Sequence, residues 1–300
     1  MSFKTNLISK KMKIALLWNK LDNNKVQCNL CAHRCIISEN EFGICDVRQN
    51  VKGDLYTHSY GKIVAKAVDP IEKKPIYHFL QNTKTYSVAA LGCNLKCSFC
   101  QNWTISQIVN NKDSDHLPDS SSADIVSSAI EYGCKSISYT YTEPTIFFEF
   151  AFDTSRLAKD NGLYNIFVTN GYMTKDAIEM IGPYLDAANV DLKAYSDEFY
   201  QNLCGGKLKS VLDSIRHLIE QNVWIEITTL LIPGKNDSEQ ELSCIAEFIA
   251  GVDLNIPWHI SRYHPDYKYL ESLPTPIESL EKARYIGMNK GLKNIYLGNV

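Results

Sequence analysis

Short apolar runs alternate with longer amphipathic stretches from Thr85 onward, and this alternation constrains the fold more than any other feature of the sequence. Strands are predicted at residues 86–91, 136–141, 165–169, 187–192, 224–232 and 258–260. Helices are predicted at residues 123–132, 146–161, 175–181, 211–221, 239–249 and 277–290. Strands that alternate with helices form parallel sheets with right-handed crossovers. The chain is therefore predicted to be an α/β protein, either a doubly wound sheet or a partial (β/α) barrel, with its chemistry at the carboxyl ends of the strands.

The composition of the 300 residues is that of a globular protein. Hydrophobic residues make up 45% and charged residues 22% of the chain, which is enough to bury a core. A net charge of −3 gives no electrostatic footprint for nucleic acid or an anionic membrane. No apolar run is long enough to span a bilayer and no signal peptide is recognised, so we expect a cytoplasmic protein. Lysines gather in the first 25 residues at roughly helical spacing, which predicts the polar face of an amphipathic helix.

Ten cysteines require an explanation, and seven of them fall into two clusters. Only Cys134, Cys204 and Cys244 stand alone, and these are predicted to be small, buried hydrophobic residues. The length of the chain and the reducing compartment expected for it disfavour a disulfide framework. Clustered cysteines in a reducing compartment indicate bound metal.

The cluster nearer the centre of the chain directly follows the strand predicted at residues 86–91. Cys93, Cys97 and Cys100 have the spacing C-x3-C-x2-C on a loop at the carboxyl end of that strand. Thiolates are the usual ligands of iron–sulfur clusters, so three of them can hold three irons of a [4Fe–4S] cluster. This loop contains no fourth cysteine, whereas a structural zinc site requires four ligands. The fourth iron is therefore predicted to be open to a small molecule.

The other cluster lies in residues 1–84, which are predicted to form an N-terminal extension to the alternating region at residues 85–300. Its members are Cys28, Cys31, Cys35 and Cys45. His33 lies between them as a spare ligand. Four thiolates without an open position suit structural zinc, which stabilises domains too small to build a large core. We favour zinc, with a second [4Fe–4S] cluster and no stable metal as the alternatives.

Several motifs together resemble those of the radical S-adenosylmethionine (SAM) superfamily, in which C-x3-C-x2-C is the hallmark spacing. The chain looks closest to the radical SAM enzymes of the AmmeMemoRadiSam system, and it is similar to pyruvate formate-lyase (glycyl-radical-enzyme) activating enzymes. The resemblance covers roughly residues 20–299. Its motifs are the two cysteine segments, DPIEKKPIYH at 69–78, YTYTEPT at 139–145, TNGY at 169–172, DLKA at 191–194 and HISRYHPDY at 259–267.

The resemblance implies a partial (β/α)6 TIM-like barrel of the radical SAM type with a small N-terminal, Cys-rich, metal-binding extension. It also implies that SAM is bound by seven residues at or after the strand ends: Phe99, Thr142, Glu143, Asn170, Asp191, Lys193 and His264. Phe99 would contact the adenine, Glu143 the ammonium and Lys193 the carboxylate. The alternatives are an ordinary ion pair for Lys193 with Asp191, a turn at Asn170 and a core position for His259.

The function that the resemblance implies is cleavage of SAM by a reduced [4Fe–4S] cluster. This reaction gives methionine and a 5′-deoxyadenosyl radical that abstracts hydrogen from a substrate, which the sequence does not identify. The expected partners are an electron donor of the flavodoxin or ferredoxin type and proteins of the AmmeMemoRadiSam system. Activation of a glycyl radical enzyme is the alternative. A non-catalytic scaffold, with zinc at both cysteine sites and no affinity for SAM, is the third hypothesis.

Overall fold

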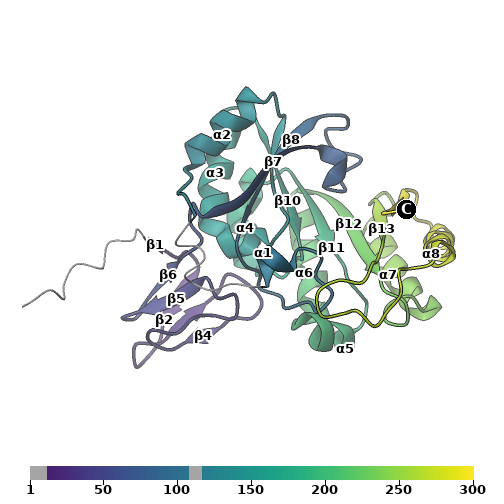
Figure 1. Ribbon diagram of the computed structural model, residues 1–300, viewed down its shortest axis with the longest axis horizontal. Helices are drawn as coiled ribbons and strands as arrows, with labels where there is room; N and C mark the ends of the chain where they lie inside the picture. Colours follow the sequence, from purple (N-terminus) through teal and green to yellow (C-terminus); the bar gives the residue numbers. More distant parts are fainter. Residues whose placement is uncertain (1–11, 108–116) are drawn as a thin grey trace, which may run out of the picture.

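The computed structural model describes residues 12–107 and 117–300, and its main feature is an eight-stranded sheet (Figure 1). The strands cross the sheet in chain order: β7 (Ile63–Pro70), β8 (Lys84–Ala90), β9 (Ser136–Tyr139), β10 (Tyr164–Thr169), β11 (Ala187–Asp191), β12 (Trp224–Leu231), β13 (Trp258–Arg262) and β14 (Ile295–Gly298). β8 to β14 are parallel, and β7 is antiparallel to β8. The six predicted strands are β8 to β13. The strictly sequential strand order differs from that of a doubly wound sheet, and β7 and β14 are both edge strands, so the sheet is a partial barrel and the predicted fold class is confirmed.

Helices connect the parallel strands. The longer ones are α2 (Ser122–Glu131), α3 (Phe148–Asp160), α4 (Lys175–Ile181), α6 (Leu208–Glu220), α7 (Glu239–Val252) and α8 (Ile277–Asn289). Shorter turns of helix are α1 (Trp103–Ser106), η3 (Pro144–Phe147), η4 (Gly182–Tyr184), α5 (Asp197–Phe199) and the π-helix η5 (Tyr200–Cys204). All six predicted helices are confirmed, and the one predicted at 146–161 begins within η3 and continues as α3. Within the described ranges, no helix is long and apolar enough to cross a membrane.

Capping and close packing explain why these elements form where they do. Ser121 accepts a hydrogen bond from the amide of Asp124 in a capping box that begins α2. The strands from β8 to β12 are buried along most of their length, as is typical of parallel strands that are covered on both faces. Trp258 on β13 is fully buried. A Cβ at Gly287 of α8 would lie 2.6 Å from the side chain of Ile295, so this glycine allows α8 to approach the sheet closely.

The N-terminal part folds into two small antiparallel sheets at one end of the molecule (Figure 1). They are formed by β1 (Lys13–Ile14), β6 (Asp54–Thr57) and β5 (Arg48–Val51), and by β2 (Trp18–Lys20), β3 (Val26–Cys28) and β4 (Ile36–Ile37). The predicted amphipathic helix is therefore wrong from residue 12 onward, because the lysines at 13 and 20 lie in paired strands. Residues 1–11 of that prediction lie outside the described residues. The division between residues 84 and 85 stays a prediction.

One segment before residue 85 belongs to the barrel, which the sequence did not predict. β7 pairs with β8, and the chain then passes through the 3₁₀ turn η1 (Ile71–Lys73). Beyond η1, Asn189 of β11 donates to Pro75 O (2.8 Å), and Glu226 of β12 accepts from the amide of His78 (2.8 Å). Residues 69–78 therefore cross the interior of the barrel from β7 to β12. We call them the floor segment.

Candidate functional site

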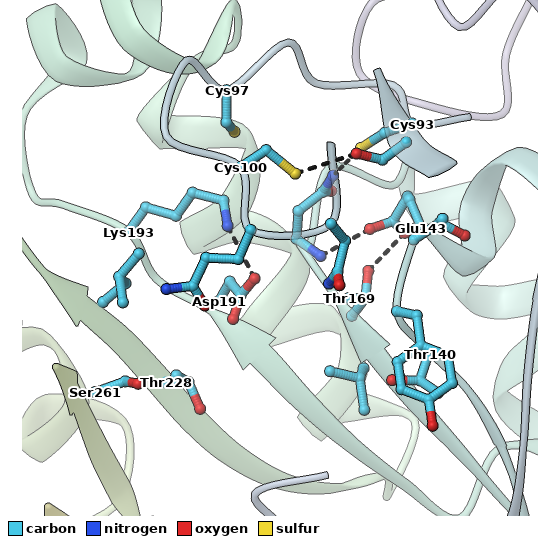
Figure 2. Close-up of a pocket in the computed structure, with 18 of the residues that line it drawn as sticks. Cys93, Cys97, Cys100, Thr140, Glu143, Thr169, Asp191, Lys193, Thr228 and Ser261 are labelled. Carbon is cyan, nitrogen blue, oxygen red and sulfur yellow. Dashed lines mark hydrogen bonds and ion pairs between the residues drawn. The ribbon is translucent and has the colours of Figure 1, made fainter. Parts of the chain in front are cut away.

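The three cysteines of the C-x3-C-x2-C motif lie on a loop that leaves β8 at Gly92. Gly92 has a φ of 105°, a conformation that favours glycine. The backbone amides of Lys96 and Ser98 donate to carbonyls of η5 (2.8 and 2.9 Å), which fixes the far side of the loop. Figure 2 shows Cys93, Cys97 and Cys100 on this loop, which arches over the strand ends.

A cavity of about 330 Å³ lies between this loop and the carboxyl ends of the strands. Its wall contains all three thiols and six of the seven residues predicted to bind SAM: Phe99, Thr142, Glu143, Asn170, Asp191 and Lys193. The seventh, His264, is exposed and lies outside the lining. Parallel strands place their carboxyl ends at one edge of the sheet, which explains why residues so distant in the sequence meet there.

Glu143 is almost completely buried and organises the cavity wall. Its Oε1 accepts from the amide and hydroxyl of Thr145 (3.1 and 2.5 Å) and from the hydroxyl of Thr169 (2.7 Å). Its Oε2 accepts from the amide of Asn170 (2.8 Å). Burial raises the pKa of Glu143 above its usual value, against the effect of these donors. Since Oε2 receives one hydrogen bond from the described residues, it can accept another without loss of these contacts.

Asn170 connects the strand ends to the cysteine loop. Its Nδ2 donates to Asn94 Oδ1 (2.8 Å) and lies 3.5 Å from Cys93 Sγ, while its Oδ1 accepts from the amide of Tyr172 (2.9 Å). Gly171 has a φ of 67°, so the predicted turn is present at this place. The turn and the position in the cavity wall coexist, and the Asn170 side chain holds the loop near Cys93.

Asp191 and Lys193 form the ion pair that was the alternative to a role in binding. Lys193 Nζ lies 2.8 Å from Asp191 Oδ2, and both side chains line the cavity (Figure 2). Burial acts to lower the pKa of Lys193, but Asp191 and nearby thiols hold that pKa well above its usual value. The pair therefore presents a charged ammonium to the cavity, where it can bind a ligand carboxylate.

Sequence reasoning missed a set of hydroxyl groups at the strand ends: Thr140, Thr169, Thr228 and Ser261. Thr228 is informative because its buried Oγ1 has no hydrogen-bond partner among the described residues. A buried hydroxyl without a partner is costly unless a ligand supplies one. Alternation along β12, which places residues 226, 228 and 230 on one face, is the signal that would have found it.

Cys204, predicted to be an isolated buried residue, is fully buried but lies beside Cys97. A hydrogen bond with the Cys204 thiol, together with burial, raises the pKa of Cys97 well above its usual value. Burial and the nearby Glu143 raise the pKa of Cys93 in the same way. The thiols therefore carry protons that a bound metal must displace.

The donor set of the large cavity fits a [4Fe–4S] cluster together with SAM. Among residues 12–107 and 117–300, no three His, Cys, Asp or Glu side chains converge as the ligands of a single ion do. In a cubane cluster, each thiolate binds a different iron, so its cysteines stand further apart than the ligands of one ion. The unpartnered Thr228 hydroxyl and the Asp191–Lys193 pair provide polar contacts of the kind that a zwitterionic ligand requires.

The four N-terminal cysteines surround a much smaller space. A cavity of about 20 Å³ is lined by Cys28, Cys31, Cys35 and Cys45. A space of this size holds about one atom, which suits a single ion better than a cubane cluster. Arg48 is fully buried beside it, donates to Cys28 Sγ (3.3 Å) and pairs with Glu149 of α3. The thiols line the cavity without converging as a closed tetrahedral site, so a metal requires them to turn inward.

The two cysteine sites share a wall. His33, the predicted spare ligand, lines the small cavity, and its Nε2 lies 2.7 Å from Asn94 O. Asn94 also lines the small cavity and receives the Asn170 hydrogen bond at the large one. Thr174 after β10 donates to Asn29 O (2.7 Å), which fastens the N-terminal segment to the barrel. The N-terminal site therefore lies where it can position the loop that begins at Cys93.

The chain is similar to known proteins in sequence and in fold. A family model described as the Radical SAM superfamily matches residues 88–243. An uncharacterized protein of Methanocaldococcus jannaschii is 44% identical over 96% of this chain and 86% of its own length. A putative glycyl-radical enzyme activating enzyme of the same organism is 29% identical over 70% of this chain and 76% of its own. The structure of a radical SAM methyltransferase from Sphaerobacter thermophilus is similar in fold, with a TM-score of 0.57, 17% identity and coverage of 74% of this chain and 68% of that one.

Proposed function

The chain belongs to the radical SAM superfamily and is an enzyme, and we propose that Cys93, Cys97 and Cys100 hold the [4Fe–4S] cluster of this family. The observation that supports this most is that all three thiols line one cavity with the polar residues of the strand ends. A cluster held there supplies the electron for cleavage of SAM into methionine and a 5′-deoxyadenosyl radical, which abstracts hydrogen from a substrate. The hypothesis of a non-catalytic scaffold is not retained.

The protein's own contribution is to bind and orient SAM and to exclude water. Lys193 binds the carboxylate of SAM, while Asp191 holds the lysine in place. Glu143 Oε2 accepts a hydrogen bond from the ammonium of SAM, and the Thr228 hydroxyl provides a further polar contact. Phe99 is 3% exposed and packs against Phe199, which gives the adenine an apolar surface.

Formation of 5′-deoxyadenosine tests this proposal. The protein is purified anaerobically, reconstituted with iron and sulfide, reduced with dithionite and given SAM. We expect 5′-deoxyadenosine from the wild type and from Cys134→Ala, because Cys134 is buried away from both cysteine sites. Cys97→Ala is expected to form none. Equal formation by Cys97→Ala and the wild type, or a wild type that holds zinc in place of the cluster, would contradict the proposal.

For the N-terminal site, we propose zinc bound by Cys28, Cys31, Cys35 and Cys45. The small cavity and the four thiols around it support a single ion. Arg48, which donates a hydrogen bond to Cys28 Sγ, provides a cationic partner for a metal-bound thiolate at that position. Metal analysis of the wild type and of Cys31→Ala tests this. One zinc per chain that is lost in Cys31→Ala is expected, whereas iron at this site would mean a second cluster.

Our first proposal for the physiological reaction is that the enzyme acts together with partner proteins of the AmmeMemoRadiSam system. A flavodoxin or ferredoxin would reduce its cluster. The joint presence of the N-terminal cysteines and the DPIEKKP stretch supports it. Co-purification from the native host tests this proposal. Recovery of such partner proteins with the wild type is expected, and their absence under conditions that recover an electron donor would count against it.

Activation of a glycyl radical enzyme is the second candidate. A relative with 29% identity carries the name of such an activating enzyme, which favours this candidate. It predicts that the reduced enzyme and SAM generate a protein-based radical in a candidate partner, detectable by electron paramagnetic resonance (EPR). Absence of that signal from all candidate partners encoded by the host genome would reject this second candidate and favour the first proposal.

A further inference from the structure

The floor segment carries two lysines into the cavity at the end away from the cysteines. Lys73, Lys74 and Pro75 line the same cavity as the three thiols. The side chain of Lys74 is 1% exposed, whereas that of Lys73 is 60% exposed. A lysine ammonium is seldom buried so completely unless charged or polar groups compensate it. The proposed function uses neither lysine.

Asp69 compensates Lys74 and fixes its position. Asp69 Oδ2 accepts from Lys74 Nζ (2.7 Å) and from the Ser87 hydroxyl (2.8 Å), and it also accepts from the hydroxyl of Tyr141. Asp69 Oδ1 accepts from Lys73 Nζ (2.9 Å). The Lys74 ammonium lies 4.2 Å from the centre of the Tyr141 ring. The network therefore holds Lys74 rigidly in the cavity wall.

The charge of this network is not balanced. Two lysines share the single carboxylate of Asp69, and this leaves one net positive charge within the network; the other acid of the floor segment, Glu72, accepts from the amide of Asn82 instead. An ammonium has three donors, and the described residues supply Lys74 with one acceptor and one ring face. Donors that remain without an acceptor in a buried wall favour a bound anion.

Strand register places the lysines away from the cysteine loop. Asp69 is opposite Thr85 at the start of β8, and the cysteines follow the end of β8. The Asp69 carboxylate that pairs with both lysines also accepts from the hydroxyl of Ser87, which lies three residues, or roughly 10 Å, before the end of β8. Near the cysteines, Lys193, which is paired with Asp191, already offers an ammonium to a ligand bound at the loop. The floor lysines are therefore not required for that ligand.

We propose that Lys74, assisted by Lys73, forms a subsite for an anionic oxygen group, a carboxylate or a phosphate, on the substrate. The inference rests on the proposed function in so far as the subsite serves the hydrogen donor of that reaction. The substrate is then a molecule or a side chain that carries an anionic group. When this group is bound at the subsite, the C–H bond that loses its hydrogen lies between the floor segment and the cysteine loop. The exposed side chain of Lys73 brings this end of the cavity to the protein surface.

Equilibrium dialysis with labelled acetate and labelled inorganic phosphate tests the subsite on the reconstituted, SAM-bound protein, with acetamide as the neutral control. We expect one anion to bind to the wild type and acetamide not to bind. Preference for acetate or phosphate identifies the anionic group. Lys74→Met is expected to weaken binding at least tenfold, and Lys209→Met, on an exposed ion pair of α6, is expected to leave it unchanged.

Asp69→Asn gives a prediction of opposite sign. It removes the carboxylate that competes for Lys74, so it should tighten anion binding at least threefold while it lowers the melting temperature. A role of the network in folding alone predicts no gain. Because Lys74→Met leaves the buried Asp69 with Lys73 as its one ion-pair partner among the described residues, the double variant Asp69→Asn/Lys74→Met is measured beside it, and it should bind as weakly as Lys74→Met.

The subsite is overturned if the wild type binds neither anion, if Lys74→Met binds as tightly as the wild type, or if Asp69→Asn does not bind more tightly. Dialysis does not depend on cleavage of SAM. Lys74-dependent binding without formation of 5′-deoxyadenosine would reject the proposed function alone. Formation of 5′-deoxyadenosine without Lys74-dependent binding would reject the subsite alone.

Discussion

The two cysteine regions differ in the number of thiols and in the space that each surrounds. Three thiols line a cavity of about 330 Å³, together with an ion pair and an unpartnered hydroxyl. Four thiols surround about 20 Å³ beside a buried arginine. An open coordination position needs room and polar contacts for an incoming molecule, whereas a closed one needs neither. Under the proposed assignments, the surroundings of each cysteine cluster, more than its spacing, distinguish the reaction centre from the structural centre.

Cysteine removal is expected to have the largest effect and to break the comparison most clearly. Cys100→Ala should reduce 5′-deoxyadenosine formation to background, because it removes a ligand of the proposed cluster. Cys45→Ala should retain formation within about tenfold at a temperature where it stays folded, since it acts only through stability. Loss of formation in both variants, with both still folded, would mean that the N-terminal site also takes part in the reaction.

The buried pair of Arg48 and Glu149 is the next test, because it joins the N-terminal site to α3. Arg48→Met should lower the free energy of unfolding by about 3–5 kcal/mol, since it leaves the Glu149 carboxylate buried and unpaired. The double variant Arg48→Met/Glu149→Leu should recover most of this loss in denaturant unfolding. A double variant as unstable as the single one would show that Arg48 acts mainly through Cys28.

Acid should destabilise the barrel by protonating Glu226 of β12. Burial acts to raise the pKa of Glu226, but hydrogen bonds from His259 and from the floor segment hold it below its usual value of 4.5. A lowered carboxyl pKa contributes stability that is present above the usual value and is lost as the pH falls below it. Glu226→Gln should therefore reduce the loss of unfolding free energy that the wild type shows as the pH falls below about 4.5. Identical pH profiles for the two proteins would contradict this account of the floor.

The smallest expected effect concerns the unpartnered hydroxyl of the open cavity. Thr228→Val should weaken SAM binding by a factor of about 3–10, because one neutral hydrogen bond contributes about 0.5–1.5 kcal/mol. Ser136→Ala removes another buried hydroxyl without a partner, outside the cavity lining, and should leave SAM binding unchanged. Binding titrations measure both. Equal effects in the two variants would remove Thr228 from the SAM site.

Much of the barrel could be predicted from the sequence because its signals are local. Each strand has a short apolar run, such as residues 166–168, that is bounded by polar or turn residues. Glu143, Asn170 and Lys193 could be placed at one edge because each follows such a run, and parallel strands end together. Local pattern and topology therefore predicted most of the cavity wall.

The rest depends on contacts that no local pattern encodes. β7 is antiparallel and only partly buried, and its place in the barrel is fixed by its pairing with β8. The floor segment is held by Asn189 and Glu226, more than a hundred residues away. Cys204 meets Cys97 through a π-helix that has no sequence signature. The lysine spacing near residue 13 suggested a helix, but cross-strand pairing with β6 decided its conformation.

The EPR spectrum of the reduced protein, with and without SAM, tests the central claim most directly, because it reports whether the cluster of Cys93, Cys97 and Cys100 is open to a ligand. We predict a [4Fe–4S] signal that changes on addition of SAM in the wild type and in Cys31→Ala, and that is absent from Cys97→Ala. A signal that SAM leaves unchanged, or one that is lost in Cys31→Ala and kept in Cys97→Ala, would contradict the account.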